Sequence, residues 1–493
     1  MSTTTTKTFA DVPANRDRLF FASCMALVVT SMTFAIRAAT LKDYTSDFGL
    51  SDAENGQVAS MVFYGFPVAM LIGGFLYNQL GPKLLLLVAF VCHLIGLTLW
   101  FTSSGYWGLM GSTFLVGFAN GSVEAACNPL VADMYPDKKT QMLNRFHVWF
   151  PGGLVIGSLI AYFFGGSLGW EMLVAVALVP TLIYGALIFG QTFPKTQNIV
   201  GDMGENIKGV LTPLFIIMAL IMTVTATTEF GAGQWVDRIL GSSGAHPMIL
   251  LGLTYGVMAL GRFFAGPIVH RFNAVGVLLL SAILSVIGLY ILGNFTGGMV
   301  YIGAIVFGLG ICYFWPTMLG FTAENIPKSG ALGLALIGGA GMLGAGIWQP
   351  FIGGWIDNYR GEALRENPEL VEQVSNYYQE NPDELATIEN LPEEGNDRTL
   401  SLYTAYTGTR TGLMEDLAGE DPNSAEAMAI KQELEPANEV ELAAGQGTLS
   451  RLLLFPAVLI AVFAGLYFFM KNRTPAEEAV LNTDAMSTPG SAM

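Results

Sequence analysis

The chain has 493 residues, of which 52% are hydrophobic and 13% charged, whereas a soluble domain carries about 25% charged residues. This composition excludes an ordinary soluble protein and indicates that much of the surface faces lipid. The formal net charge of −16 arises in one acidic segment between Asp357 and Ser450, and the rest of the chain is neutral. No basic surface suited to nucleic acid is therefore expected.

Apolar stretches long enough to cross a bilayer, about 20 residues each, follow one another along the chain. We place them at residues 19–40, 55–80, 84–103, 107–133, 142–166, 170–193, 211–238, 247–270, 274–295, 299–323, 329–356 and 451–471. Several carry closely spaced glycines, which let membrane helices approach one another. The predicted fold class is an all-α membrane protein with twelve transmembrane helices.

These spans divide into two groups of six. The predicted segments are an N-terminal tail (1–18), an N-terminal six-helix bundle (19–193), a polar linker (194–210), a C-terminal six-helix bundle (211–471) and a C-terminal tail (472–493). An even number of spans places both termini on one side, and the basic residues of the short loops gather on that side, which predicts that it is cytoplasmic.

The acidic segment 358–449 joins the last two spans. The same topology places it outside the cytoplasm of a plasma (inner) membrane. Its short amphipathic stretches predict a small helical cap. This cap is expected to act as a solvated lid near the substrate entrance, with a partner-docking module as the alternative.

The four cysteines lie in apolar runs and lack the spacing of metal ligands, which predicts buried packing residues rather than disulfides or a zinc site: Cys24, Cys92, Cys127 and Cys312. No metal and no cofactor are expected.

The loop after the second span is echoed after the eighth. The two copies read GFLYNQLGPK at 74–83 and GPIVHRF at 266–272. Both resemble the G-x-x-x-D-R-x-G-[RK] loop between the second and third helices of each half in major facilitator proteins, with an asparagine and a histidine in place of the aspartate. The resemblance implies two pseudo-symmetric halves that rock about a midplane site. It assigns gate or structural roles to Asn78, Lys83, His270 and Arg271.

Ionisable side chains inside the membrane cost about 3 kcal/mol even on insertion scales, so each needs a partner or a role. Glu124 stands in the fourth span between Asn120 and Asn128, and this spacing places all three on one helical face. A stripe of amide, carboxylate and amide suits a hydroxyl-rich ligand. The alternative is a polar seam that only packs the fourth span against a neighbour.

Glu229 in the seventh span is the counterpart of Glu124 in the second half. Desolvation holds a mid-membrane carboxylate neutral until it titrates near physiological pH, which a proton-coupled carrier requires. Glu124 and Glu229 are therefore the predicted proton-coupling residues. A structural ion pair between Glu229 and Arg238 is the alternative.

Arg37 lies past the middle of the first span and keeps its charge. It either neutralises one of the two glutamates or binds an anionic substrate with both edges of its guanidinium. We expect it to face Glu124 or Glu229, which favours a neutral sugar as substrate. If no acid lies within ion-pair distance, an organic anion becomes the better substrate.

Further polar residues inside the spans complete the predicted site. His147, close to Asn144 in the fifth span, is expected to relay protons or donate to a substrate oxygen, with a packing histidine as the alternative. The other predicted substrate ligands are Asn144, Gln234, Trp235, Trp315 and Gln349. Gate or scaffold roles are predicted for two charges near the cytoplasmic helix ends, Arg262 and Glu324.

At these residues the chain resembles the fucose-galactose-glucose proton symporter branch of the major facilitator superfamily. The resemblance implies that Glu124, in the motif E-x-A-x-N-P, is a protonation and sugar-recognition residue with Asn128 beside it. That branch has an aspartate in the first helix, where this chain reads IRAA around Arg37 and has no acid. The matching stretches are VEAACNPL (123–130), EFGAG (229–233), GRF (261–263), WPT (315–317) and QPFIGGWID (349–357).

The sequence thus predicts a secondary active transporter that moves a small polar solute, a sugar in the first place, by proton-coupled alternating access. The alternatives are an organic-anion or sugar-acid carrier that uses Arg37, and a membrane receptor that uses the acidic segment. No nucleotide loop or nucleophile constellation indicates an enzyme or an ATP-driven pump. We expect a monomer in the lipid bilayer, with a small solute and protons as its partners and no nucleic acid.

Overall fold

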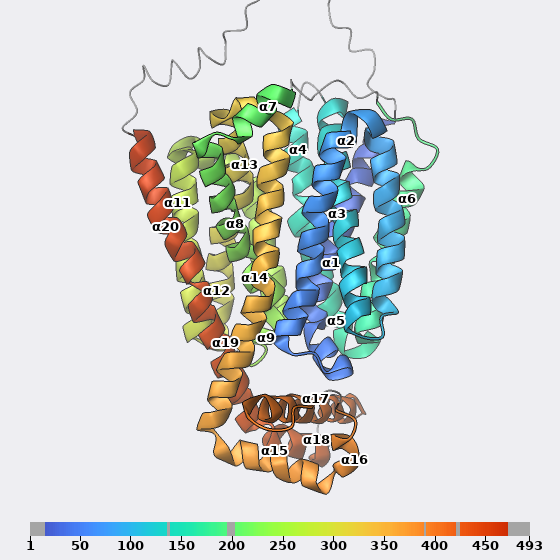
Figure 1. The fold of residues 1–493 in the computed structure, drawn as a ribbon, viewed down its shortest axis with the longest axis vertical. Coiled ribbons are helices and arrows are strands. Elements are labelled where there is room, and N and C mark those ends of the chain that lie inside the picture. The colour runs from blue at the N-terminus through green and yellow to red at the C-terminus, as the bar shows by residue number, and fades with distance from the viewer. Residues whose placement is uncertain (1–14, 136–138, 195–202, 389–390, 421–423, 472–493) are drawn as a thin grey trace, which may run out of the picture.

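The computed structural model describes residues 15–135, 139–194, 203–388, 391–420 and 424–471. Every regular element in these ranges is a helix. The helices form an upright bundle, and a separate helical layer lies across one end of it (Figure 1). Residues 1–14 and 472–493 of the predicted tails and residues 195–202 of the predicted linker lie outside the described residues.

The first six spans form the N-half. Two of its helices, α2 and α5, each contain two spans. They are divided where Gly81 and Gly169 adopt left-handed backbone conformations (φ 70° and 69°), which glycine adopts without steric cost. The elements are α1 (Arg16–Phe48), α2 (Asp52–Phe101), α3 (Tyr106–Met134), α4 (Lys139–His147), α5 (Trp149–Val176) and α6 (Leu178–Ile188).

The last six spans form the C-half. Short breaks divide three spans into the pairs α8/α9, α12/α13 and α19/α20, and Asn273 (φ 52°) interrupts α11 near its start. The elements are α8 (Pro213–Gln234), α9 (Val236–Leu240), α10 (Pro247–Phe263), α11 (Ala265–Asn294), α12 (Gly298–Ile311), α13 (Phe314–Asn325), α14 (Gly330–Glu366), α19 (Glu435–Leu452) and α20 (Leu454–Lys471). The short helices α7 (Met203–Val210) and η2 (Pro327–Ser329) pack together beside this half.

Nine helical stretches among the described residues are long and apolar enough to cross a membrane. One of them, Arg145–Ile188, contains two spans because of the break at Gly169. The polar helix α3 and the shorter α10 complete the set. The prediction of twelve spans in two six-helix halves is confirmed.

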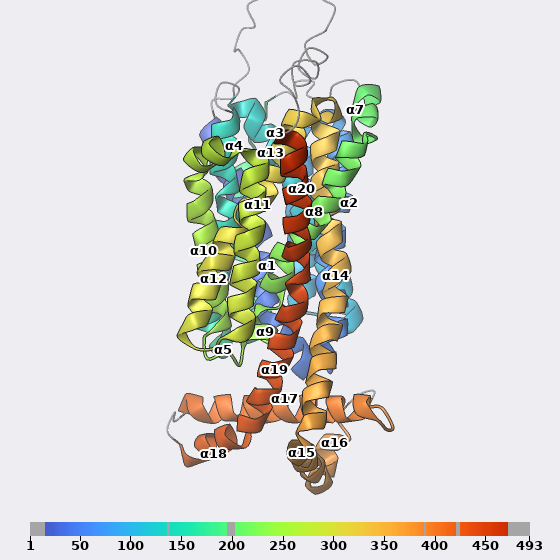
Figure 2. The same cartoon turned by 90° about the vertical axis from the view of Figure 1, so that its left-hand side faces the viewer.

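Residues 367–434 are here called the insert. Their described part (367–388, 391–420 and 424–434) forms the layer across the end of the bundle, which we call the insert end (Figures 1 and 2). Because α14 runs unbroken to Glu366 and α19 begins at Glu435, the insert is carried on two helices of the C-half. Its helix α17 also contacts α1 of the N-half. The helices are α15 (Pro368–Glu380), α16 (Pro382–Leu385), α17 (Asn396–Glu420) and α18 (Ala425–Glu433).

The insert has a core of its own, separate from that of the bundle. Its buried members include Leu370, Val374, Tyr378, Tyr403, Tyr406, Ile430 and Leu434. Leu364 of α14 and Val440 of α19 belong to the same core. The insert is therefore a folded helical layer that is packed onto the projecting ends of the C-half.

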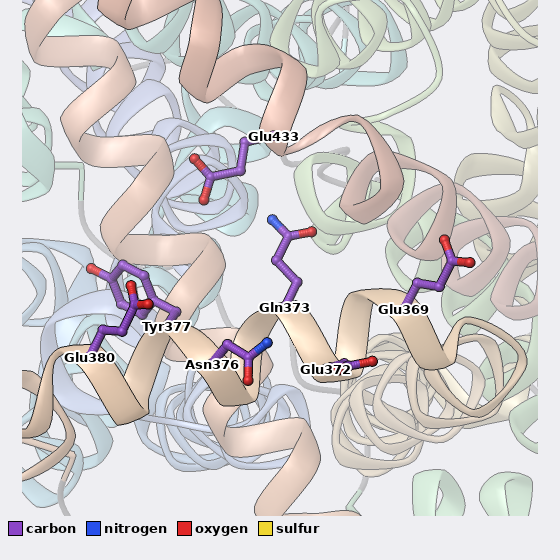
Figure 3. Close-up of a pocket in the computed structure, with 7 residues that line it drawn as sticks. All are labelled: Glu369, Glu372, Gln373, Asn376, Tyr377, Glu380 and Glu433. Carbon is purple, nitrogen blue, oxygen red and sulfur yellow. The ribbon is translucent and has the colours of Figure 1, made fainter.

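A groove of about 440 Å³ opens between α15 and the end of α18 (Figure 3). It is lined by Glu369, Glu372, Gln373, Asn376, Tyr377, Glu380 and Glu433. Burial raises the pKa of Glu433, but hydrogen bonds from Arg410 and Tyr406 outweigh it, so the pKa of this carboxyl lies below its ordinary value. These bonds tie α17 to α18 and are internal to the insert.

The two halves meet mainly along α2 and α14 and along α5 and α10. The closest approach is at the insert end, where a methyl group added to Gly353 would lie 1.9 Å from the carbonyl oxygen of Asp52. Farther along the same contact, a methyl group on Gly56 would lie 2.5 Å from the carbonyl oxygen of Gln349. The backbones of the halves therefore touch, and larger residues at either glycine would separate them.

Candidate functional site

Arg37 of α1 lies between the two halves and is 1% exposed. Its Nη2 donates a hydrogen bond to Oε1 of Gln234 on α8. No carboxylate of the described residues lies within 4 Å of its guanidinium, and Arg238 pairs with Asp52 rather than with Glu229. The expectation that Arg37 faces Glu124 or Glu229 is therefore wrong, as is the alternative pair of Glu229 with Arg238.

Aromatic rings surround the Arg37 guanidinium. Its Cζ lies 5.0 Å from the ring centroid of Phe34 and 5.1 Å from that of Phe63. The ring of Phe230, from the C-half, packs against the rings of Phe34 and Phe63, with centroid distances of 5.5 and 5.4 Å. Cation–π contacts supply about 2 kcal/mol each when desolvated, which explains how the cation is tolerated at this depth.

Two hydrogen-bond donors at this position have no acceptor within the described residues. Nε of Arg37 and Nε2 of Gln234 are both buried and unpaired. Gln234 has turned its oxygen toward the cation, so its amide hydrogens are left over. A buried pair of unpaired donors beside a positive charge is suited to an anion that accepts from both.

A second polar cluster joins α3 to α4 in the N-half. Nδ2 of Asn128 donates to Oε2 of Glu124 at 2.6 Å. The oxygen of Asn128 lies 2.9 Å from Nε2 of His147, which therefore carries the proton. The structure thus brings together three of the predicted site residues, with Glu124 only 8% exposed.

Asn120, the third member of the predicted stripe, faces the interior of the N-half. Its oxygen lies 2.8 Å from Nε2 of His93, whose Nδ1 is 2.9 Å from the hydroxyl of Tyr184. Its Nδ2 donates to Thr33 at 3.2 Å. Both ends of the amide are thereby bonded to protein groups, and its predicted role as a substrate ligand stays a prediction.

This network gives a stability prediction. Replacing His93 with leucine removes the hydrogen-bond partner of the buried Asn120 oxygen and of the buried Tyr184 hydroxyl. The free energy of unfolding is therefore expected to fall by about 2 kcal/mol. The measurement is the thermal unfolding of purified protein in detergent. Cys92→Ala, at the neighbouring half-buried position, is the control and should have a smaller effect. A His93→Leu protein as stable as the wild type would contradict the assigned network.

Glu229 of α8 is 2% exposed, and no described donor is within hydrogen-bond distance of its carboxylate. Arg262 of α10 lies near enough to interact electrostatically with both Glu229 and His147, although Nε of Arg262 donates to the carbonyl of Cys312 at 3.1 Å. The buried hydroxyl of Tyr255 nearby also has no hydrogen-bond partner in the part of the chain that the structure describes. Arg262, predicted as a gate or scaffold charge, therefore also lies within electrostatic range of the predicted coupling residue Glu229.

The remaining predicted residues take different positions. Nε1 of Trp235 donates to Oε1 of Gln349 at 2.9 Å, and both side chains are fully buried. Trp315 is half-buried against α14, while Lys83 and Glu324 are exposed. The described residues do not include the side chains of Asn78, Asn144, His270 and Arg271.

No group of three or more His, Cys, Asp or Glu side chains among the described residues could hold a metal ion. The four cysteines are free, and three of them are buried.

The family model of the Major Facilitator Superfamily matches residues 19–349, which is most of the membrane body. The chain belongs to this superfamily. It is therefore a multi-pass membrane transporter of small solutes. The predicted superfamily is confirmed, and the resemblance to the fucose-galactose-glucose branch stays a prediction. The whole insert lies beyond the matched residues.

Known transporters show the same relationship. A cis,cis-muconate transport protein of Acinetobacter baylyi is 24% identical over 68% of this chain and 86% of its own length. A facilitated glucose transporter of Xenopus laevis, solute carrier family 2 member 10, is 25% identical over 32% of this chain and 29% of its own length. The second match therefore covers only part of either protein.

Solved structures agree on the fold. The D-xylose–proton symporter superposes with a TM-score of 0.59 at 14% identity, over 68% of this chain and 89% of its own. A bacterial homologue of the human lysosomal transporter Spinster, inward-facing and occupied, gives 0.64 at 13% identity, over 93% and 99%. At these identities the likeness concerns the fold alone.

Proposed function

We propose that this chain is a secondary active carrier for a small organic anion, and that Arg37 and Gln234 bind the carboxylate group of this substrate. The observation that carries the proposal is the buried guanidinium of Arg37, which has no carboxylate partner among the described residues. A substrate carboxylate accepts from Nε of Arg37 and from the amide of Gln234 together. It supplies the negative charge that the protein side chains around Arg37 lack.

A neutral sugar fits this position less well. A hydroxyl group accepts a hydrogen bond but brings no charge, so the cation would remain unbalanced at mid-depth. The similarity to a muconate transport protein over most of that protein's length supports a carboxylate. The similarity to a glucose transporter, over about a third of this chain, keeps sugars as the second candidate.

Proton coupling is proposed for two carboxyl groups on opposite halves. Glu229 lies in α8, the helix that also carries Gln234, and Glu124 is bonded to Asn128. A proton taken up with the substrate neutralises its charge, so a monoanion and one proton cross the membrane without net charge movement. Arg262 and His147 are proposed to influence these sites electrostatically.

The proposed orientation has both termini in the cytoplasm of a plasma membrane and the insert outside. It is supported by the basic residues of the short loops on the terminal side. Met428 of α18 is 60% exposed, so a cysteine there should react with an impermeant maleimide added to intact cells. Labelling only after the cells are broken would reverse the orientation.

The substrate class is tested by uptake into proteoliposomes that contain the purified carrier. The probes are radiolabelled cis,cis-muconate, glucuronate and glucose, of which the last two share a ring and differ by a carboxylate. We expect uptake of at least one carboxylate in response to a pH gradient and none of glucose. Glucose uptake that the carboxylates do not inhibit would reject the anion-carrier proposal in favour of the sugar.

A further inference from the structure

Five charged side chains meet at the insert end, where the halves touch. Asp52 begins α2 in the N-half, and its side chain is fully buried. The other four belong to the C-half: Arg238 on α9, Asp357 and Arg360 on α14, and Glu441 on α19. Asp52 is therefore the one member of this cluster that leaves when the halves separate.

The two arginines bind Asp52 from two directions. Arg238 contacts both carboxylate oxygens, with Nε to Oδ1 at 2.7 Å and Nη2 to Oδ2 at 2.8 Å. Nη1 of Arg360 contacts Oδ2 at 2.8 Å. On the other side, the carboxylate of Asp357 accepts from the backbone N–H groups of Asp52 (3.3 Å) and Ala53 (2.9 Å), and so caps α2.

Arg360 has two further partners that do not depend on the N-half. Its Nη1 lies 3.3 Å from Oδ1 of Asp357 on the same helix, and Glu441 is the closer of the two. Nε and Nη2 of Arg360 contact the two oxygens of Glu441 at 2.8 and 2.9 Å. The buried Tyr403, from α17 of the insert, is 1% exposed. Its hydroxyl lies 3.2 Å both from Oε1 of Glu441 and from the carbonyl oxygen of Ala437. The insert thus fixes Glu441, and Glu441 fixes Arg360.

The charges of the cluster explain what Glu441 contributes. With the halves together, three carboxylates face two guanidinium groups. When Asp52 leaves, Arg238 and Arg360 remain with Asp357 and Glu441, and the C-half cluster is balanced. Without Glu441, separation would leave one excess positive charge in a partly desolvated place, which is costly.

We propose that Asp52, Arg238 and Arg360 form a charge latch that holds the insert end closed, and that Glu441, positioned by Tyr403 of the insert, is the substitute partner of Arg360 when the latch opens. The insert thereby sets how readily the carrier opens at this end. This role goes beyond the proposed substrate and does not depend on it.

Two substitutions act in opposite directions. Asp52→Asn removes the charge that both arginines bind, so it favours separation of the halves. Glu441→Gln leaves the closed latch paired but unbalances the open one, so it favours closure. If Glu441 only stabilised the fold of the insert, its loss would loosen the contact and shift the protein in the same direction as Asp52→Asn.

The measurement is the distance between two nitroxide labels, determined by pulsed electron resonance in liposomes without substrate. The labels are placed at Trp107→Cys in the N-half and Phe295→Cys in the C-half, exposed positions (79% and 42%) at the insert end. The four native cysteines are replaced by alanine. Glu433→Gln, which removes the partner of Arg410 inside the insert, is the matched control.

We expect Asp52→Asn to raise the ratio of long to short distances, and Glu441→Gln to lower it, by about fivefold each, the effect of roughly one partly solvated ion pair. Glu433→Gln should match the wild type. The same comparison on a Gly56→Ala background, which pushes the halves apart without changing the charges of the cluster, reveals the closing effect if the wild type is almost wholly closed. An increase or no change with Glu441→Gln on both backgrounds would overturn the proposal. In the double variant Asp52→Asn/Glu441→Gln, a ratio of long to short distances below that of Asp52→Asn alone would also overturn the proposal.

Discussion

Replacing Arg37 with glutamine is expected to lower carboxylate uptake by about 100-fold, because losing one partner of a buried charged hydrogen-bond pair costs roughly 3 kcal/mol. The substrate carboxylate would still have to shed its water but would find only neutral donors. The amide of Gln234, freed from the cation, cannot replace the charge.

The same substitution is expected to leave the carrier folded. No described carboxylate is paired with Arg37, so its removal leaves no buried anion unpaired. The substitution removes the desolvation cost of a buried cation, which offsets the loss of its contacts with Phe34 and Phe63, so the unfolding temperature should stay the same or rise. Lower stability together with lower uptake would point to a structural role instead.

Two further variants separate charge from geometry. Arg37→Lys keeps the positive charge but loses the planar fork, and is expected to retain about one tenth of the uptake. Arg451→Gln is the control, because Arg451 also lies over two aromatic rings, those of Trp355 and Tyr359, but is exposed. Undiminished carboxylate uptake by Arg37→Gln would remove Arg37 from the binding site.

The spans were predictable because the bilayer sets a length and excludes charge. The breaks inside α2 and α5 were predictable as boundaries between spans, since Gly81 and Gly169 interrupt long apolar runs. The helical breaks within single spans, such as that between α8 and α9, leave no comparable mark. They depend on packing between helices that are distant in sequence.

The candidate site was predictable only where helical spacing decides contact. Asn128 and Glu124 are four residues apart on α3, and their side chains bond as this spacing indicates. Asn120 shares the same spacing but bonds to His93 on α2, a residue that the sequence did not single out because a lone histidine in an apolar span carries little signal. Tertiary packing chose the partner.

The partner of Arg37 illustrates the same limit. A guanidinium in the membrane predicts a nearby acid on energetic grounds, yet this one is held by Gln234 and by aromatic rings. Phe34, three residues before Arg37, lies on the same helical face and was the available signal. Asp52 and Arg360, 308 residues apart in sequence, had no local signature that joined them.

Glu229→Gln is expected to abolish accumulation driven by a pH gradient while exchange of substrate across the membrane continues. The amide resembles the protonated carboxyl in shape and charge, so the substrate can still bind and the halves can still exchange conformations. What is lost is the requirement that a proton accompany the substrate. Glu124→Gln should act in the same way if both carboxyl groups titrate during transport.

The assay compares two readings on the same proteoliposomes. With one proton per monoanionic substrate such as glucuronate, the wild type should accumulate it about tenfold for each unit of pH difference, whereas Glu229→Gln should stop at equal concentrations inside and outside. Exchange of labelled for unlabelled substrate, measured without a gradient, should stay within about threefold of the wild type, because the amide costs the bound state little. Glu324→Gln, at an exposed position, should accumulate normally. Continued accumulation by Glu229→Gln would place proton coupling elsewhere, with Glu124 beside His147 as the remaining carboxyl group. Loss of both accumulation and exchange would instead make Glu229 part of the substrate-binding site.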